Sequence, residues 1–167
     1  MPATAQRRSE TTEGRSRRQP DAIALLKNDH AEVAELLDSY EKNKDKWRAD
    51  RKQKVAAEIC KALTVHARIE EEIFYPACDQ GVDDAEDLLA EARVEHSTLK
   101  MLIGKIEAAT PGSEEYDAEV TVLGEYVKHH VKEEQNELFP KVRKSDLDLK
   151  ELGEQMAGRK SQLMAAK

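Results

Sequence analysis

The sequence contains an internal repeat in which a histidine is followed by a glutamate four residues later and by a proline ten residues later. One copy runs from His66 to Pro76 and the other from His130 to Pro140, each with an aromatic residue just before the proline. A further histidine precedes each copy, in Asp29-His30 and in Glu95-His96, by 36 and 34 residues. The repeat therefore predicts a fold in which two copies of one two-helix unit pack together.

Four segments have the apolar spacing of amphipathic helices, with apolar residues every three or four positions. We expect helices over about 21–43, 52–74, 85–109 and 114–139. Pro20 and Asp21 form the start of the first, and the two prolines of the repeat are expected to end the second and fourth. The charged stretch 44–54 fits either a loop or an exposed helix extension.

The composition supports an all-α fold. The chain of 167 residues has only 7 Gly and 5 Pro, and strand-forming residues do not gather into alternating runs. Short connections between long helices favour antiparallel neighbours, so we predict an up-down four-helix bundle. We expect a disordered basic tail at 1–20, the bundle at 21–142, and a short amphipathic helix at 143–167 that Ser145 caps.

The charge distribution argues against nucleic acid as a partner. Five arginines outweigh two glutamates in residues 1–20, so this stretch carries +3 of a net charge of −7 and the remaining chain carries −10. An acidic body repels phosphates. We also expect no membrane partner, no secretory signal and a cytoplasmic protein, because no long apolar run is present and the two cysteines lack disulfide spacing.

The repeat also predicts a metal site. Residues four apart on an α-helix lie about 40° apart around the axis, so the histidine and glutamate of each copy share the apolar face. Burying imidazoles and carboxylates without compensation costs several kcal/mol per charge, and divalent cations remove that cost. The predicted metal ligands are His30, His66, Glu70, His96, His130 and Glu134.

The ligand count predicts two iron ions. If each glutamate bridges both metals and each metal takes two histidines, an oxo or hydroxo bridge completes five bonds and leaves one position open on each six-coordinate ion. Hydrogen peroxide, dioxygen or nitric oxide are candidate ligands for these positions. Zinc fits less well, because it prefers four ligands and has no redox chemistry.

This ligand pattern resembles the hemerythrin-type HHE cation-binding domain over residues 21–142. The resemblance implies an up-down bundle with a non-haem di-iron centre. Two features depart from the oxygen-carrying members: Lys100 stands where they have a further histidine, and Glu134 follows its histidine by four residues instead of five. The chain is therefore more similar to the six-ligand branch, some of whose members are associated with peroxide breakdown, sensing of iron or oxygen, and nitrosative stress.

Other residues near the motif have alternative interpretations. Tyr126, one turn before His130, is expected to face the site and is the candidate catalytic residue, with core packing as the alternative. His129 is expected to face solvent, and Lys100 either reaches the pocket mouth or points outward. We interpret Glu71, Glu72, Glu133 and Glu137 as surface charges, and Tyr75 and Phe139 as packing at the bundle end.

The predicted function is a di-iron protein that breaks down peroxide or another small oxidant in a catalase- or peroxidase-like manner. One alternative is a module that senses iron, oxygen or nitric oxide without turnover. Another is a metal-free bundle used for association.

Overall fold

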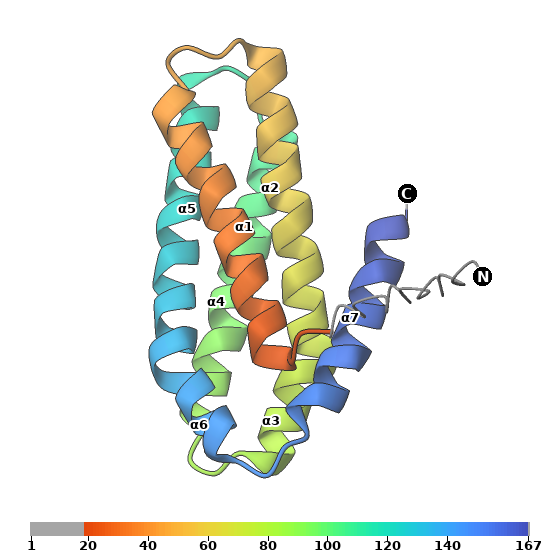
Figure 1. Ribbon diagram of the computed structural model, residues 1–167. Helices are drawn as coiled ribbons and strands as arrows, with labels where there is room; N and C mark the ends of the chain where they lie inside the picture. Colours follow the sequence, from red (N-terminus) through yellow and green to blue (C-terminus); the bar gives the residue numbers. More distant parts are fainter. Residues whose placement is uncertain (1–18, 167) are drawn as a thin grey trace, which may run out of the picture.

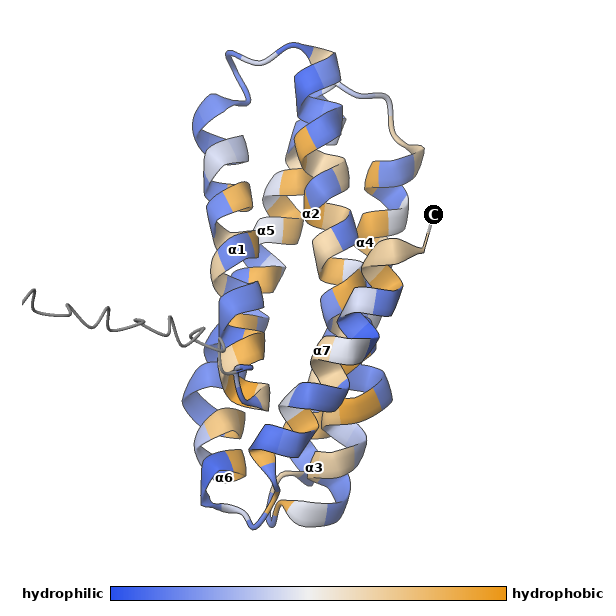
Figure 2. Cartoon of the chain, turned by 45° about the vertical axis from the view of Figure 1, so that its right-hand side comes forward, coloured by the Kyte–Doolittle hydropathy of each residue, from blue (hydrophilic) through white to orange (hydrophobic). Residues whose placement is uncertain are grey.

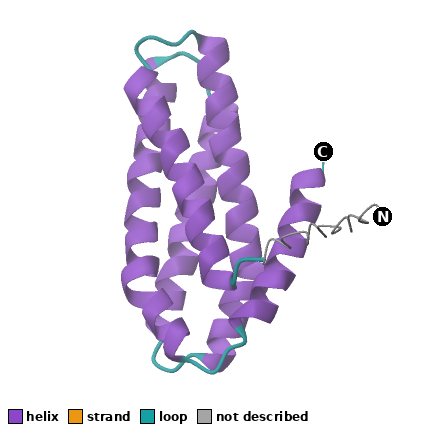
Figure 3. Ribbon diagram, in the orientation of Figure 1, coloured by secondary structure: helices purple, strands orange, loops and turns teal. Residues whose placement is uncertain are grey.

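The four predicted helices form an up-down bundle in the computed structural model, which describes residues 19–166. Figure 1 shows successive long helices running in opposite directions, and Figure 3 shows only helices and loops over the described residues. This confirms the predicted all-α fold. The four long helices are α1 (Ala22–Asn43), α2 (Ala49–Ile69), α4 (Glu86–Ala108) and α5 (Glu114–Glu133). The predicted tail at 1–20 lies almost wholly outside the described residues.

Two wide π-helical turns extend α2 and α5, and the prediction that prolines end these helices was wrong. The added segments are η1 (Glu70–Phe74), η2 (Glu134–Leu138), α3 (Tyr75–Gly81) and α6 (Phe139–Lys144). Pro76 and Pro140 each occupy the first turn of the segment that follows the π turn. Each proline directly follows the residue that closes the wide turn with a hydrogen bond to the carbonyl five residues back, Tyr75 to Glu70 and Phe139 to Glu134, and the helix continues past it.

The ends of the helices follow from local capping. Asp21 accepts a hydrogen bond from the Ala24 N–H at 2.8 Å and starts α1. In the charged stretch left open above, residues 44–48 connect the helices and α2 begins at Ala49. The last helix, α7 (Leu149–Ala165), is capped by Asp148 and not by Ser145 as expected, because the Ser145 hydroxyl donates to the Val142 carbonyl at 2.6 Å.

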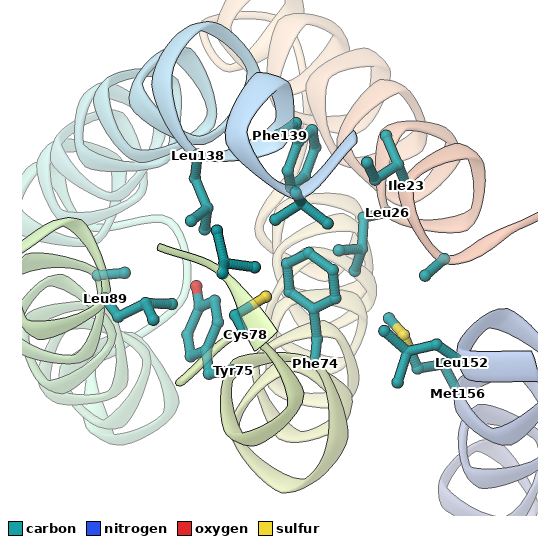
Figure 4. Packing of buried hydrophobic residues seen from close by; sticks show 14 of the residues in the cluster. Ile23, Leu26, Phe74, Tyr75, Cys78, Leu89, Leu138, Phe139, Leu152 and Met156 are labelled. Atoms are coloured by element: carbon teal, nitrogen blue, oxygen red, sulfur yellow. The ribbon is translucent and has the colours of Figure 1, made fainter. Parts of the chain in front are cut away.

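Each long helix buries one stripe of apolar residues against its neighbours, and these residues form two clusters. Figure 2 shows apolar positions recurring along the inner sides of the helices. Figure 4 shows the lower cluster, which includes Ile23, Leu26, Phe74, Leu138, Phe139 and Met156. The upper cluster includes Val33, Tyr40, Ile59, Leu99, Leu123 and Val127. The predicted ligands lie between the two clusters along each long helix, as His30 does between Leu26 and Val33.

Helix α7 packs against α1 and α2 on the outside of the bundle (Figure 1). Leu152 and Met156 join the lower cluster (Figure 4). Gly153 permits the close approach, since a Cβ there would lie 2.6 Å from the Pro20 carbonyl oxygen. None of the described helices has the length and apolar character needed to cross a membrane.

Candidate metal centre

Four buried histidines form two pairs inside the bundle. In the first half-site, the Nε2 atoms of His30 on α1 and His66 on α2 lie 3.2 Å apart. In the second half-site, the Nε2 atoms of His96 on α4 and His130 on α5 lie 3.3 Å apart. Each of the four residues is at most 5% exposed. The rings therefore present paired nitrogens to the interior from four helices.

Glu70 and Glu134 lie between the half-sites at the first residue of each π turn. The Glu70 carboxylate places one oxygen 3.2 Å from His66 Nε2 and the other 3.2 Å from His96 Nε2. Glu134 Oε2 lies 3.3 Å from His30 Nε2 and 3.6 Å from His130 Nε2. Each carboxylate thus contacts both half-sites, and the structure brings the six predicted ligands into one buried cluster.

The donor atoms of this cluster fit divalent metal ions. Among the described residues, three buried side-chain oxygens accept no hydrogen bond, and two of them lie in this cluster: Glu70 Oε1 and Glu134 Oε2, which face the Nε2 atoms of His66 and His30. Buried polar atoms without a partner are rare because each costs free energy. Neutral imidazole and carboxylate are ligands for iron, manganese and zinc. A cation between these atoms would satisfy both carboxylate oxygens and the facing Nε2 lone pairs.

The outer nitrogens of the histidines are held by polar side chains. Carboxylate oxygens face three Nδ1 atoms: Asp29 on His66 at 3.3 Å, Glu71 on His96 at 2.9 Å and Glu95 on His130 at 2.7 Å. The fourth, His30 Nδ1, instead faces the amide nitrogen of Gln135 at 3.0 Å, which is a donor. A carboxylate that accepts from Nδ1–H leaves the Nε2 lone pair free for a metal. Glu71 is therefore part of the site, not a solvated surface charge as predicted.

The two buried carboxylates also favour positive charge in the metal-free cluster, as the pKa values of its residues show. Burial alone lowers the pKa of His66, but the Glu70 charge and the hydrogen bond to Asp29 outweigh it and raise that pKa to about 10. Burial alone raises the pKa of Glu70, yet His66 and His96 hold it well below its usual range. Protons supply the positive charge when no metal does.

Tyr75 also lies in the cluster, although the sequence analysis placed it in end packing. Its hydroxyl donates to Glu134 Oε1 at 2.7 Å and lies 3.3 Å from His96 Nε2. Burial, then the charges of Glu70 and Glu134, raise the pKa of Tyr75 well above its usual range, so the phenol keeps its proton. The equivalent residue in the repeat, Phe139, instead stacks on His30 with ring centroids 5.9 Å apart.

The π turn explains why the helical pattern missed Tyr75. On a regular α-helix, a residue five positions after Glu70 would lie about 140° away around the axis. In η1 the Tyr75 N–H bonds the Glu70 carbonyl, five residues back. This wider turn brings the two side chains to the same side.

Tyr126 does not face the site as predicted, because its side chain is 43% exposed. The buried residues of α5, including Leu123 and Val127, lie on one side of His130 around the helix axis. Tyr126 lies about 40° to the other side, just outside that buried arc. Its position gives no support to a catalytic role. His129 is exposed, as expected.

A cavity of about 20 Å³ adjoins the cluster on its histidine side. All four histidines line it, together with apolar residues of the upper cluster such as Val33, Leu63, Leu99 and Val127. The two glutamates and Tyr75 are not among the lining residues. The site therefore has an apolar pocket next to the imidazoles and a hydrogen-bonded side that holds the carboxylates.

With this geometry in view, comparison with known proteins decides the family. The model of the hemerythrin HHE cation-binding domain matches residues 21–142. The chain belongs to the hemerythrin HHE cation-binding domain family. The matched residues are those predicted from the ligand pattern.

A solved structure from Mycobacterium kansasii, described as a hemerythrin HHE cation-binding domain-containing protein, is similar to this HHE domain. The two share 25% identity with a TM-score of 0.71, over 86% of this chain and 87% of that one. A Nostoc sp. protein described as a DNA nickase is 29% identical over 137 residues, which are 81% of this chain. The match covers only 37% of the Nostoc protein.

Lys100 supports the second half-site through Glu71. Lys100 Nζ donates to Glu71 Oε2 at 2.6 Å, while Glu71 Oε1 faces His96. Lys100 thus reaches the edge of the site through Glu71 and helps to keep that carboxylate ionised. In the first half-site, Lys160 of α7 donates to Asp29 Oδ1 at 2.5 Å in the same way.

Proposed function

We propose that this HHE domain binds two non-haem iron ions, joined by an oxide or hydroxide, at the six clustered ligands. We propose further that it breaks down hydrogen peroxide in the cytoplasm, converting two peroxide molecules into two waters and one dioxygen. A pair of irons supplies a store of two electrons, which this disproportionation requires. Iron is proposed over zinc because zinc has no redox chemistry and cannot store these electrons.

The observation that carries the proposal is the cavity of about 20 Å³ against the four histidines. A space of this size holds about one water-sized molecule. Its apolar walls, including Leu63 and Leu99, keep bulk water and larger substrates away from the imidazoles. Molecules of two heavy atoms, such as peroxide, dioxygen and nitric oxide, exceed this space by about one atom, whereas ordinary metabolites exceed it many times over.

Tyr75 acts from the opposite side as a positioning residue. Its protonated hydroxyl donates to Glu134 Oε1, which fixes the carboxylate and withdraws negative charge from it. Because Phe139 occupies the equivalent place, this hydrogen bond exists on one side of the repeat only. We expect Tyr75 to set the properties of the second half-site.

The test is oxygen evolution from peroxide by protein purified without added metal, with iron per chain measured in parallel. His66→Ala should abolish the activity. Tyr75→Phe should lower the rate roughly tenfold or more and shift the near-ultraviolet absorption of the bound iron, whereas the matched variant Tyr126→Phe should change neither. Turnover no greater than that of the same amount of free iron would remove the catalytic proposal.

A second candidate function, sensing by metal occupancy, is supported by the contacts of α7. Lys160 on α7 bonds Asp29, which faces His66, and the neighbouring Arg159 bonds Glu72 in η1 at 2.6 Å. Loss of iron would loosen this chain of contacts because metal binding is linked to folding. Proteolysis near α7 should then be faster in the iron-free protein. Equal cleavage and equal melting temperature of both forms would exclude sensing.

DNA nicking by the Nostoc protein does not imply the same activity here, because the match covers only 37% of that protein. The charge of −10 outside residues 1–20 also disfavours phosphate contacts. We propose that nucleic acid is not a partner. Retention of the chain on a DNA column at physiological salt would contradict this.

A further inference from the structure

A second group of metal-ligand side chains lies on the surface beside the buried cluster. His129 Nε2 lies 3.2 Å from Glu95 Oε1 on α4 and 3.3 Å from Glu133 Oε1, one turn further along α5. The three ligand atoms lie within 4.8 Å of one another. The imidazole is 61% exposed, while the side chains of Glu95 and Glu133 are 16% and 31% exposed. We call these three residues the outer cluster.

The donor geometry of the outer cluster suits a divalent cation. Two carboxylate oxygens converge on one ring nitrogen, which carries at most one proton and can satisfy them only through a shared, long hydrogen bond. One imidazole and two carboxylates are ligand types for zinc, manganese and ferrous iron, with water completing the shell. His129 and Glu133 have the same four-residue spacing as the histidine–glutamate pairs inside.

The other half of the repeat provides an independent comparison. Asp29 is the equivalent of Glu95, since each directly precedes a ligand histidine and faces the Nδ1 of the next one along the chain. The second oxygen of Asp29 binds the Lys160 ammonium at 2.5 Å. The second oxygen of Glu95 faces His129 and no lysine or arginine among the described residues. The Lys160 ammonium thus neutralises Asp29 in the first half of the repeat. At the equivalent place in the second half, Glu95 faces the other residues of the outer cluster.

The repeat also shows that the outer cluster is specific to its own half. The positions equivalent to His129 and Glu133 are Val65 and Ile69, which cannot bind a metal. Glu95 and Glu133 also line a cavity of about 10 Å³ together with Glu134 of the buried site and the apolar residues Leu88, Ala92 and Leu138. We propose that Glu95, His129 and Glu133 form a third divalent-cation site at the surface, next to the buried pair.

The test is a metal count by equilibrium dialysis against Zn²⁺, using the full chain. The wild-type protein should bind one more ion than His129→Gln, and Glu133→Gln should lose the same ion. Glu91→Gln is the matched control, because it removes an exposed carboxylate one turn before Glu95 without removing a ligand. It should bind as many ions as the wild type. The difference of one ion does not depend on how many the buried site holds.

Spectroscopy separates this site from the buried one. Mn²⁺ added to His66→Ala should still give the electron paramagnetic resonance signal of one bound ion, and this signal should disappear in His66→Ala combined with His129→Gln. Equal counts in wild type and His129→Gln would overturn the proposal. Equal losses in Glu91→Gln and Glu133→Gln would also overturn it, because they would indicate attraction by net charge without ligation.

Discussion

The two half-sites have the same ligands but different surroundings. Each offers two imidazoles to the interior, and each shares the carboxylates of Glu70 and Glu134 with the other. The first half-site is bordered by Asp29, Gln135 and Phe139, and the second by Glu95, Glu71 and Tyr75. The candidate ligands are therefore duplicated, while the residues that contact them have diverged.

This difference would make the two proposed metal positions unequal. In the first half-site one carboxylate faces a histidine and the other partner is a neutral amide, whereas two carboxylates face the histidines of the second. Carboxylate partners make an imidazole a stronger ligand. We expect the second half-site to hold ferric iron more tightly than the first. Phe139, which has no hydroxyl, leaves the first half-site without the hydrogen bond that Tyr75 provides.

The largest effect should come from removing one ligand in either half. We expect both His66→Ala and His130→Ala to reduce iron from about two ions per chain to less than one, because Glu70 and Glu134 contact both half-sites. Iron analysis of purified protein measures this, with Lys132→Ala as an exposed control next to the site. Retention of one full iron by either variant would show that the half-sites bind independently.

A smaller change should follow from exchanging the side chains that face the Nδ1 atoms of the histidines. Glu71→Gln gives the second half-site the amide of the first, and we expect iron affinity to fall about tenfold. Gln135→Glu should have the opposite effect. Chelator competition measures the affinity, and Mössbauer spectra should show the two irons becoming more alike in Glu71→Gln. The control is Glu72→Gln, whose side chain bonds arginines and no histidine; an equal loss there would contradict the argument.

Much of this site could be predicted from sequence, because the ligands follow α-helical geometry. His66 and Glu70 share a face at four-residue spacing, and the repeat supplies the same face again with His130 and Glu134. The apolar stripes then determine that these faces point inward, which the buried cluster bears out. The fold followed from the same periodicity.

The residues that surround the ligands were less predictable. Tyr75 reaches the cluster only because η1 is a π turn. The spacing of apolar residues in the sequence does not predict this change of helical pitch. Tyr126 has the right spacing but lies just beyond the edge of the buried arc, which depends on how α5 is rotated against its neighbours. The contact between Glu71 and His96 joins residues 25 apart and requires the tertiary structure.

The pH dependence of iron binding tests whether protons occupy the metal-free cluster. The pKa of His66 is raised from its ordinary value to about 10, so this imidazole carries a proton at pH 7. Iron needs the Nε2 lone pair, and loading should therefore release protons. Because the pKa of His66 is about 10, affinity should fall about tenfold per pH unit as the pH drops below about 10, for each proton released. Acidification on adding iron to a weakly buffered solution is the readout; unchanged pH would refute this account.

The smallest effect concerns the two cations that α7 brings to the first half-site. Lys160 donates to Asp29, whose side chain is 8% exposed, whereas Arg159 pairs with Glu72 where both side chains are about one-third exposed. Removing Lys160 leaves a buried carboxylate with His66 as its remaining partner. We expect Lys160→Met to lower the free energy of unfolding by about 1.5–3 kcal/mol. Arg159→Met should cost less than about 1 kcal/mol, because solvent screens an exposed pair.

Urea unfolding of the metal-free protein measures both variants of α7 under the same conditions. A larger loss for Lys160→Met would show that burial of Asp29, and not the number of ion pairs, determines how firmly α7 is held. Helix α7 packs against α1 and α2, the helices of the first half-site, so Glu95→Gln on α4 should change stability less than Asp29→Asn. If the two carboxylate variants lose the same stability, α7 does not distinguish the halves, and the inequality of the metal positions would rest on Glu71 and Tyr75 alone.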